Sequence, residues 1–230
     1  MIRLFVGHDP REAVAFDVFA HSVITRASEP VALVPLVLGS LAKRYSETHT
    51  DGSNQFIYSR FLVPFLCDFQ GWAIFADGDM LCRADIAELW ALRDPNKAVQ
   101  VVQHDYKTKH ATKYLGSRND DYPRKNWSSV IIFNCAHPKN QWLRPKCIAS
   151  ATGSYLHRFS WLEDRDIGRL PKTWNHLVGE YDPDPAAKLL HYTLGTPCFR
   201  GYELGDEAAW WYAELDKILD VPEKSILLPK

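Results

Sequence analysis

Residues 72–79 read WAIFADGD, and this stretch decides the fold that we expect. Five consecutive apolar residues after Gly71 are typical of a strand that is buried on both faces in the middle of a sheet. The strand runs directly into Asp77 and Asp79. Because burying unpaired carboxylates costs several kcal/mol, a cation is the partner that we expect for this pair.

Aspartates two positions apart occur three times in the chain, so the spacing alone does not identify a site. Asp182 and Asp184 lie in a proline-flanked turn, and we interpret them as structural because aspartate there bonds to the local backbone. Asp77 and Asp79 differ from the other two pairs because they directly follow a strand that we expect to be buried. Mg²⁺ and Mn²⁺ take oxygen ligands from one or two carboxylates and leave positions for substrate phosphates. Gly78 between the aspartates would let a diphosphate approach the backbone, although a turn ending the strand is the simpler alternative.

Strands alternate with helices on both sides of this stretch. After a first strand at 2–6, Asp9 starts a helix, with Pro10 at its first position and Glu12 closing a capping box. The region 104–127 is polar and without a period, which predicts a long loop over a site. The remaining expectations are strands at 31–38, 98–102, 130–133 and 188–192, helices at 55–65, 85–92 and 210–219, and a loop at 45–54 with a turn at Asp51-Gly52. The pattern predicts an α/β sheet with ligands at the carboxyl ends of its strands.

The composition favours one domain, residues 1–230, with a full core, because 46% of the 230 residues are hydrophobic. With 27 Lys+Arg against 28 Asp+Glu, the net charge of -1 gives no general field to hold nucleic acid. A locally basic patch for peripheral membrane contact stays open. The five cysteines are odd in number and lack CxxC pairing, which predicts reduced cytoplasmic thiols. We expect neither a signal peptide nor a transmembrane segment.

Three motifs in order resemble glycosyltransferase family 8: YSRF at 58–61, FADGDML at 75–81 and HYTLGTP at 191–197. That family has the GT-A fold, a Rossmann-like mixed central sheet flanked by helices. The resemblance covers most of the chain as an order of motifs. It implies a metal-dependent hexosyltransferase that uses a nucleotide sugar, with UDP as the expected nucleotide, and retains the configuration of the sugar.

The resemblance also assigns a metal site. It implies that Asp77, Asp79 and His191 bind Mn²⁺ together, with Mg²⁺ as the alternative. An imidazole ligand favours Mn²⁺ over the harder Mg²⁺. Arg200 is our candidate for the positive charge of a lysine that the family carries in its late motif and this chain lacks.

The nucleotide and donor are assigned to further residues by position in the family motifs. The family's first turn contacts the uridine, which points to Gly7, His8 and Asp9, although Asp9 serves equally well as a helix cap. Arg60 matches an arginine near the diphosphate, and an ordinary salt bridge is its alternative. Gly195 of the late motif joins Asp77 and Gly78 in the predicted donor site.

An acidic segment at 161–167 resembles the family motif near the donor sugar. In the family an amide residue lies between the two aspartates, and here that position is Arg165. We predict that Asp164, Arg165 and Asp166 take part in catalysis, with the aspartates bonding to sugar hydroxyls. A charged surface helix is the alternative.

The expected function is transfer of a sugar from a UDP-sugar to a hydroxyl of a glycan or another acceptor, with the metal as Lewis acid. Three alternatives stay open. A nucleotidyltransferase would carry a Gly-rich phosphate loop after the first strand, and residues 7–10 lack one. An aspartate-nucleophile phosphatase usually has its carboxylates after the first strand. A non-catalytic module that binds a nucleotide sugar or carbohydrate would use tryptophans as stacking platforms.

Overall fold

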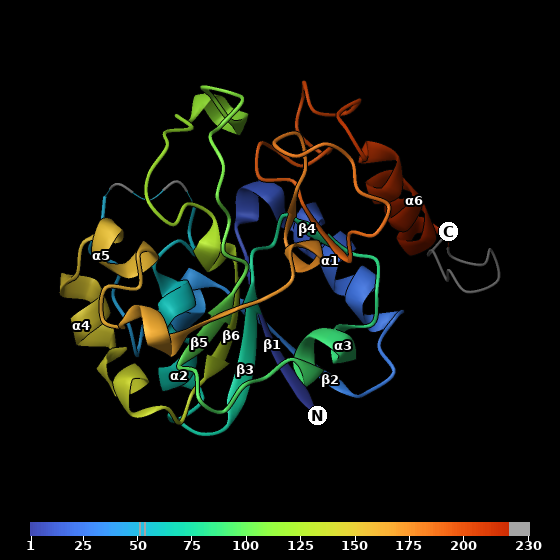
Figure 1. Cartoon of the computed structure of the whole chain (residues 1–230). Coiled ribbons are helices and arrows are strands. Elements are labelled where there is room, and N and C mark those ends of the chain that lie inside the picture. The colour runs from blue at the N-terminus through green and yellow to red at the C-terminus, as the bar shows by residue number, and fades with distance from the viewer. Residues whose placement is uncertain (51, 53, 221–230) are drawn as a thin grey trace, which may run out of the picture.

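A mixed sheet organises the computed structural model, which describes residues 1–50, 52 and 54–220 (Figure 1). Within these residues the strand order is β2-β1-β3-β6-β5-β7, and a smaller sheet has the order β4-β9-β8. The strands of the large sheet are β1 (Ile2–Gly7), β2 (Val31–Leu36), β3 (Trp72–Ala76), β5 (Val99–Val101), β6 (Val130–Asn134) and β7 (Ile167–Arg169). The small sheet consists of β4 (Met80–Cys82), β8 (His176–Leu177) and β9 (Leu189–His191).

The apolar run at 72–76 forms β3, an inner strand of the large sheet between β1 and β6. Its side chains alternate between two cores, as the period of a strand requires. Ala73 and Phe75 belong to one hydrophobic cluster, and Ile74 and Ala76 belong to the other. The prediction of a strand buried on both faces is confirmed.

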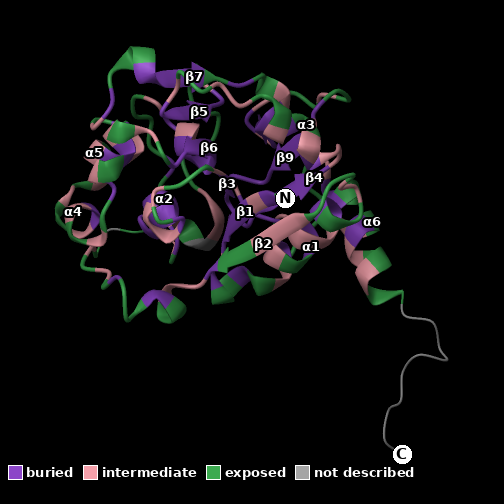
Figure 2. Cartoon of the chain, turned by 90° about the horizontal axis from the view of Figure 1, so that it is seen from below, coloured by how far each residue is buried: buried purple, intermediate pink, exposed green. Residues whose placement is uncertain are grey.

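Helices cover both faces of the large sheet (Figure 1). On one face α1 (Ala13–Ile24) and α3 (Ile86–Ala91) pack into the cluster that includes Ile74, and α6 (Ala208–Leu219) packs against α1. On the other face lie α2 (Val63–Leu66), α4 (Pro145–Ser150) and α5 (Gly153–His157). Seen from below, the strands are mostly buried and the outer helices expose one side (Figure 2). Short 3-10 helices are Pro10–Glu12, Leu38–Leu41, Ser59–Leu62, Tyr114–Gly116, Trp127–Ser129, Pro138–Trp142, Asp164–Asp166 and Lys172–Trp174.

Several predicted elements need correction. The helix expected at 55–65 begins only at Ser59, as a 3-10 turn that continues into α2. The strand expected at 188–192 exists, but it belongs to the small sheet, where it pairs with β4 and β8. Asp9 caps its helix, whereas Glu12 makes no capping-box hydrogen bond among the described residues, and its Oε2 is buried without a hydrogen bond.

The region 104–127 is a long loop, as expected, and we call it the covering loop. Its regular structure is the 3-10 turn at Tyr114–Gly116 and a bridge between Thr112 and Arg118. The turn predicted at Asp51-Gly52 includes Asp51, which lies outside the described residues. No helix in the described part of the chain is both long and apolar enough to cross a membrane. The single-domain interpretation stays a prediction.

Candidate metal and nucleotide site

The two sheets meet at the carboxyl end of β3, where they bring Asp77, Asp79 and His191 together. β4 follows the aspartates directly and pairs antiparallel with β9, so that Met80 lies opposite His191. The backbone N–H of Tyr192 donates to the carbonyl of Asp79 at 3.0 Å, which extends this pairing to the second aspartate. The His191 Nε2 atom therefore lies 3.4 Å from Asp79 Oδ1 and 4.0 Å from Asp77 Oδ2.

Asn175, which sequence reasoning missed, fixes the orientation of the His191 ring. The Asn175 amide nitrogen donates to the carbonyl of Asn126 at 3.2 Å and to Ser129 Oγ at 2.8 Å. Its oxygen therefore faces His191 and accepts from Nδ1 at 3.0 Å. Because Nδ1 carries the proton, Nε2 presents its lone pair to the two carboxylates, the arrangement typical of a metal-binding histidine.

The three side chains fit a divalent cation, and we call them the Asp-Asp-His group. Their ligand atoms lie within 4.8 Å of one another, and all three residues are buried. Asp77 Oδ1 and Asp79 Oδ1 are buried oxygens without a well-aligned hydrogen bond among the described residues. Two carboxylate oxygens and one imidazole nitrogen are a donor set that Mn²⁺ accepts.

The surroundings of the two aspartates shift their pKa values in opposite directions. Burial and the nearby Asp79 raise the pKa of Asp77 to about 7, although Arg60 and His191 oppose the shift. Burial acts in the same direction on Asp79, but the interactions with His191 and Lys113 outweigh it and hold the pKa of Asp79 below its ordinary value. A cation bound between the carboxylates would favour their ionised forms.

Arg60 lies beside the group and makes an ion pair with Asp77, with 2.7 Å between Nη1 and Oδ1. The same nitrogen donates to the carbonyl of Ser128 at 2.9 Å, and Nε donates to the carbonyl of Ile57 at 3.0 Å. The salt bridge that we considered as an alternative is therefore present. Arg60 also lines the cavity described next, and its contact with a diphosphate stays a prediction.

A cavity of about 360 Å³ opens at the Asp-Asp-His group. All three members of the group line it, together with residues from the covering loop, from the segment before β6 and from α5. Lys113 of the covering loop contributes a positive charge. Burial lowers the pKa of Lys113, while Asp79 and Asp77 act in the opposite direction, so the ammonium lies within the field of both carboxylates.

A buried polar network that the sequence did not reveal holds the covering loop in place. Glu180 accepts from the backbone N–H of Lys109 at 2.7 Å and from the Asn119 amide at 2.9 Å. Lys125 donates to the Asn119 oxygen at 2.6 Å. Farther along the loop, the N–H of Tyr114 donates to the carbonyl of Leu194 at 2.7 Å, three residues after His191. The loop is thus tied to the segment that carries the histidine.

The first turn has a structural role, and Asp9 caps its helix, as one of the two predicted alternatives has it. Asp9 accepts hydrogen bonds from the backbone and guanidinium of Arg11 and from the backbone N–H of Gln55, which satisfies the carboxylate within the chain. The His8 ring packs edge-on against Phe16, at 5.4 Å between centroids. Gly7, His8 and Asp9 are not among the residues that line the cavity.

Gly78 faces protein rather than the cavity. A Cβ atom at this position would lie 2.2 Å from the carbonyl oxygen of Gly7, closer than atoms approach in folded proteins. The glycine is therefore needed for the contact between the end of β1 and the aspartate turn, and its role in diphosphate binding stays a prediction. Gly195 packs in a similar way, since a Cβ there would lie 3.0 Å from Tyr114 and Tyr202.

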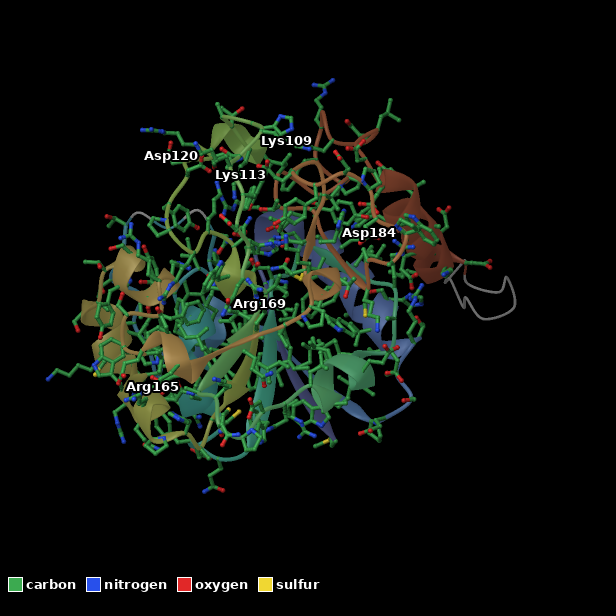
Figure 3. The ribbon with its side chains drawn as sticks, viewed as in Figure 1. Lys109, Lys113, Asp120, Arg165, Arg169 and Asp184 are labelled. Atoms are coloured by element: carbon green, nitrogen blue, oxygen red, sulfur yellow. The ribbon has the colours of Figure 1, made fainter. Side chains whose placement is uncertain are left out.

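The acidic segment at 164–166 lies at the other end of the strands from the Asp-Asp-His group. The structure therefore does not bring the predicted catalytic residues to the site. Backbone hydrogen bonds place Asp166 level with the start of β3. The carbonyl of Asp166 accepts from the N–H of Ala98, and the carbonyl of Ala98 accepts from the N–H of Asn134. Asn134 is in turn the strand partner of Trp72, the first residue of β3. Asp77 follows the end of this five-residue strand. At about 3.3 Å per residue, the length of β3 puts roughly 15 Å between the level of the acidic segment and that of Asp77. Figure 3 shows Arg165 at the lower left and Lys113 at the top.

Local partners engage the side chains of the acidic segment. Asp166 accepts from Lys139 at 2.6 Å, and its side chain also bonds to the backbone of Glu163. Asp164 pairs with Arg124, and Arg165 pairs with Glu163 at 2.8 Å. These contacts agree with the alternative of a charged surface helix, which takes the form of the 3-10 helix at Asp164–Asp166. Arg200 is likewise exposed and absent from the cavity wall, where Lys113 lies instead.

No family model matches the chain. Among curated proteins, Protein CDI of Arabidopsis thaliana is 45% identical to it over 223 residues, which are 94% of this chain and 86% of that protein. The name of this relative gives no activity.

Solved structures of similar fold are glycosyltransferases. Apo GlyE from Streptococcus pneumoniae TIGR4 matches with a TM-score of 0.61 at 13% identity, over 97% of this chain and 65% of that one. The galactosyltransferase LgtC, solved with donor and acceptor sugar analogs, matches at 0.58 and 13% identity over 97% and 98% of the two chains. The bifunctional WbbM matches at 0.57 and 15% identity over 96% of this chain, which spans about half of WbbM. At these identities the likeness shows the fold, and the predicted GT-A fold is confirmed.

Proposed function

The chain belongs to the same family as Protein CDI of Arabidopsis thaliana and has the GT-A fold, and from this premise we propose that it is a glycosyltransferase. The proposed reaction moves a sugar from a nucleotide-sugar donor to a hydroxyl of an acceptor. One observation carries the proposal. The buried Asp-Asp-His group lies at the carboxyl end of an inner strand and opens into a cavity, which is the place where α/β sheets bind ligands.

The chain's own residues would bind the donor at its phosphates. A divalent metal held by Asp77, Asp79 and His191 would act as a Lewis acid on the nucleoside diphosphate that leaves the sugar. Lys113, which lies within the field of Asp77 and Asp79, would add positive charge beside the diphosphate. Asn175 would keep the His191 ring in its binding orientation. The covering loop would exclude water from the reacting bond.

Mn²⁺ is the proposed ion because His191 supplies an imidazole ligand, with Mg²⁺ as the alternative. UDP as the nucleotide, a hexose as the sugar, retained configuration and membership of glycosyltransferase family 8 follow from the resemblance of the three sequence motifs. The proposed location is the cytoplasm, which agrees with five cysteines that are free in the structure.

Calorimetry with UDP, with and without Mn²⁺, tests the proposal. A transferase of this kind should bind UDP at least about tenfold more tightly when Mn²⁺ is present, because the ion links the diphosphate to the carboxylates. A control variant, Asp182→Asn, changes an aspartate whose side chain is 98% exposed and should keep this dependence. Equal UDP affinity with and without Mn²⁺ would favour the non-catalytic binding module and contradict the metal assignment.

A further inference from the structure

A second hollow, of about 640 Å³, lies along β7, the edge strand of the large sheet, and we call it the basic groove. None of the residues that line it has a role in the donor site described above. The side chains that matter for its chemistry are those of Lys97, Gln103, Arg124, Trp127, Asp164 and Arg169.

The basic groove carries positive charge that the described part of the chain does not neutralise. Its one wall carboxylate among the described residues, Asp164, pairs with Arg124. Lys97 donates to the carbonyl of Arg165 at 2.8 Å, and this neutral acceptor leaves the lysine charge unbalanced. Arg169 is exposed, and its guanidinium makes no hydrogen bond or ion pair with another described residue. Two cations of the groove are therefore free to bind anionic groups.

The neutral groups beside these cations suit a sugar ring. Arg124 lies over the Trp127 ring at 5.3 Å from its centroid, and the indole N–H donates to the carbonyl of His104 at 2.9 Å. Both side chains are thus fixed in the wall. The Gln103 amide also lines the groove and makes no hydrogen bond with another described residue. An amide both donates to and accepts from hydroxyls, while an indole offers apolar surface to the carbon atoms of a ring.

The basic groove reaches the same edge of the sheet as the Asp-Asp-His group. β3, β5 and β7 run in one direction, because β6 is antiparallel to both β3 and β5, and β7 is parallel to β5. Asp77 follows β3, Gln103 comes shortly after β5, and Arg169 ends β7. At about 4.8 Å between strands, Gln103 lies roughly 10 Å and Arg169 roughly 14 Å across the sheet from Asp77. Figure 3 shows Arg169 between Arg165 and Lys113 in that view.

Two contacts make the basic groove a neighbour of the cavity at the Asp-Asp-His group. Trp127 lines the groove, and the next residue, Ser128, lines the cavity. Arg124 donates to the carbonyl of Arg158, a residue that also lines the cavity. Adjoining walls of this kind suit one ligand that reaches from the cavity into the groove.

Building on the proposed function, we infer that the basic groove binds an acidic saccharide, which is the acceptor of the transferred sugar. Arg169 and Lys97 bind carboxylates of this saccharide, and Gln103 bonds to one of its hydroxyls. The acceptor's reacting hydroxyl lies in the cavity, close to the donor. Arg169 is then a specificity residue that favours acceptors with uronic-acid units over neutral glycans.

Calorimetry with three probes tests which chemistry the groove selects. The probes are a uronic-acid trisaccharide, the same trisaccharide with its carboxyl groups reduced to alcohols, and a capped triglutamate peptide of equal charge. The wild-type protein should bind the acidic trisaccharide at least about tenfold more tightly than either other probe, because only this probe offers both carboxylates and ring hydroxyls. This affinity should fall as the salt concentration rises.

Each contrary result of these titrations overturns a stated part of the inference. Equal affinity for the reduced trisaccharide overturns the role of charge. Equal affinity for the peptide overturns the assignment of a saccharide. Absence of binding by the acidic trisaccharide overturns the whole.

Two variants place the binding in the groove. Arg169→Gln and Lys97→Gln should each lose roughly tenfold in affinity for the acidic trisaccharide, since each removes a charge-assisted hydrogen bond. Arg44→Gln removes the same charge from an exposed residue that lines neither hollow, and it should bind as the wild type does. Thermal melting first establishes that all three variants are folded. Wild-type affinity in both groove variants, or an equal loss in Arg44→Gln, overturns the inference.

These titrations need neither UDP nor Mn²⁺, so they fail independently of the proposed function. If the acidic trisaccharide binds as expected but UDP binds without Mn²⁺ dependence, the proposed function fails and the groove is a saccharide site without a donor site beside it, which overturns its role for an acceptor. If UDP binding depends on Mn²⁺ but the groove variants bind the trisaccharide normally, the proposed function stands and the inference fails.

Discussion

Replacing Asn175 by alanine tests whether the Asp-Asp-His group is a metal site with a supporting hydrogen bond. Asn175 is fully buried and is not among the residues that line the cavity at the Asp-Asp-His group, so we expect its side chain to act on the site through its neighbours. The substitution removes the acceptor of His191 Nδ1 and the donor to Asn126 and Ser129. Loss of such a partner typically weakens metal binding 10- to 100-fold, which corresponds to about 1.4–2.7 kcal/mol.

The same substitution should also lower the stability of the fold. It leaves three hydrogen-bonding groups without their partner, and at about 1 kcal/mol for each bond the free energy of unfolding should fall by roughly 3 kcal/mol. Asn140→Ala is a matched control, because Asn140 is equally buried and bonds to Ala98, Asn134 and Trp161 on the far side of the molecule. The control should lose similar stability and keep its affinity for Mn²⁺.

Calorimetric titration with Mn²⁺ and urea unfolding of both variants give the two quantities. The account requires that Asn175→Ala binds Mn²⁺ at least tenfold more weakly than Asn140→Ala at equal folded fraction. If the two variants bind Mn²⁺ equally, His191 does not need a fixed ring to bind metal, and the reasoning about its orientation is refuted.

Three further predictions concern other parts of the chain. Lys113→Ala should weaken UDP binding about tenfold in calorimetry, whereas Lys109→Ala, in the same loop but outside the cavity wall, should not; equal effects would contradict the role of Lys113. Gly78→Ala should lower the free energy of unfolding by about 1–3 kcal/mol in urea, because its Cβ would clash with Gly7, and unchanged stability would show that this contact is absent. Glu214 should stabilise the fold by up to about 3 kcal/mol above pH 4.5, its ordinary pKa, and lose this contribution as the pH falls toward 2.

The sign of the Glu214 prediction follows from its ion pairs. Burial opposes ionisation, but hydrogen bonds from Arg26, His21 and Lys217 outweigh it and lower the pKa of Glu214 to about 2. A lowered carboxyl pKa adds its full stability where the group is ionised in both the folded and the unfolded chain, and progressively less as the pH falls from the unfolded pKa to the folded one. Urea unfolding of Glu214→Gln across this pH range should therefore show a flatter acid side, and a profile parallel to that of the wild type would contradict the assignment.

Local sequence patterns were enough to predict the parts of the fold that depend on neighbouring residues. The five apolar residues of β3 and the aspartates after it form one continuous segment, so their burial and their place at the strand end were predictable. Asp9 was predictable as a cap for the same reason, because the hydrogen bond to Arg11 spans two residues. The covering loop was recognisable from its lack of any period.

Contacts that depend on pairing between strands far apart in the sequence could not be predicted from such local patterns. Asn175 meets His191 because β8 and β9 lie side by side, and nothing in the sequence around Asn175 marks it as a metal-supporting residue. The need of a metal-binding histidine for a partner was predictable, but the identity of that partner was not. The role of Gly78 likewise depends on the carbonyl of Gly7, 71 positions earlier in the chain.

The acidic segment shows where similarity of a short motif misleads. Asp164, Arg165 and Asp166 matched a family pattern in letters, and their charges suited a site. Their position is set by the pairing of β7 with β5, which starts at Ile167 and Val99 and places the segment before the amino end of a strand. The spacing of charges along the chain carries no information about this register.

The most direct test of the central claim is UDP release from UDP-sugars by the wild-type protein and by Asp79→Asn, measured with and without Mn²⁺. The account predicts release by the wild-type protein only with Mn²⁺. Because the metal supplies several kcal/mol of charge stabilisation, it predicts release at least about a hundredfold slower in the folded variant. Equal rates of UDP release from the wild-type protein and Asp79→Asn would contradict the claim that this carboxylate pair drives sugar transfer.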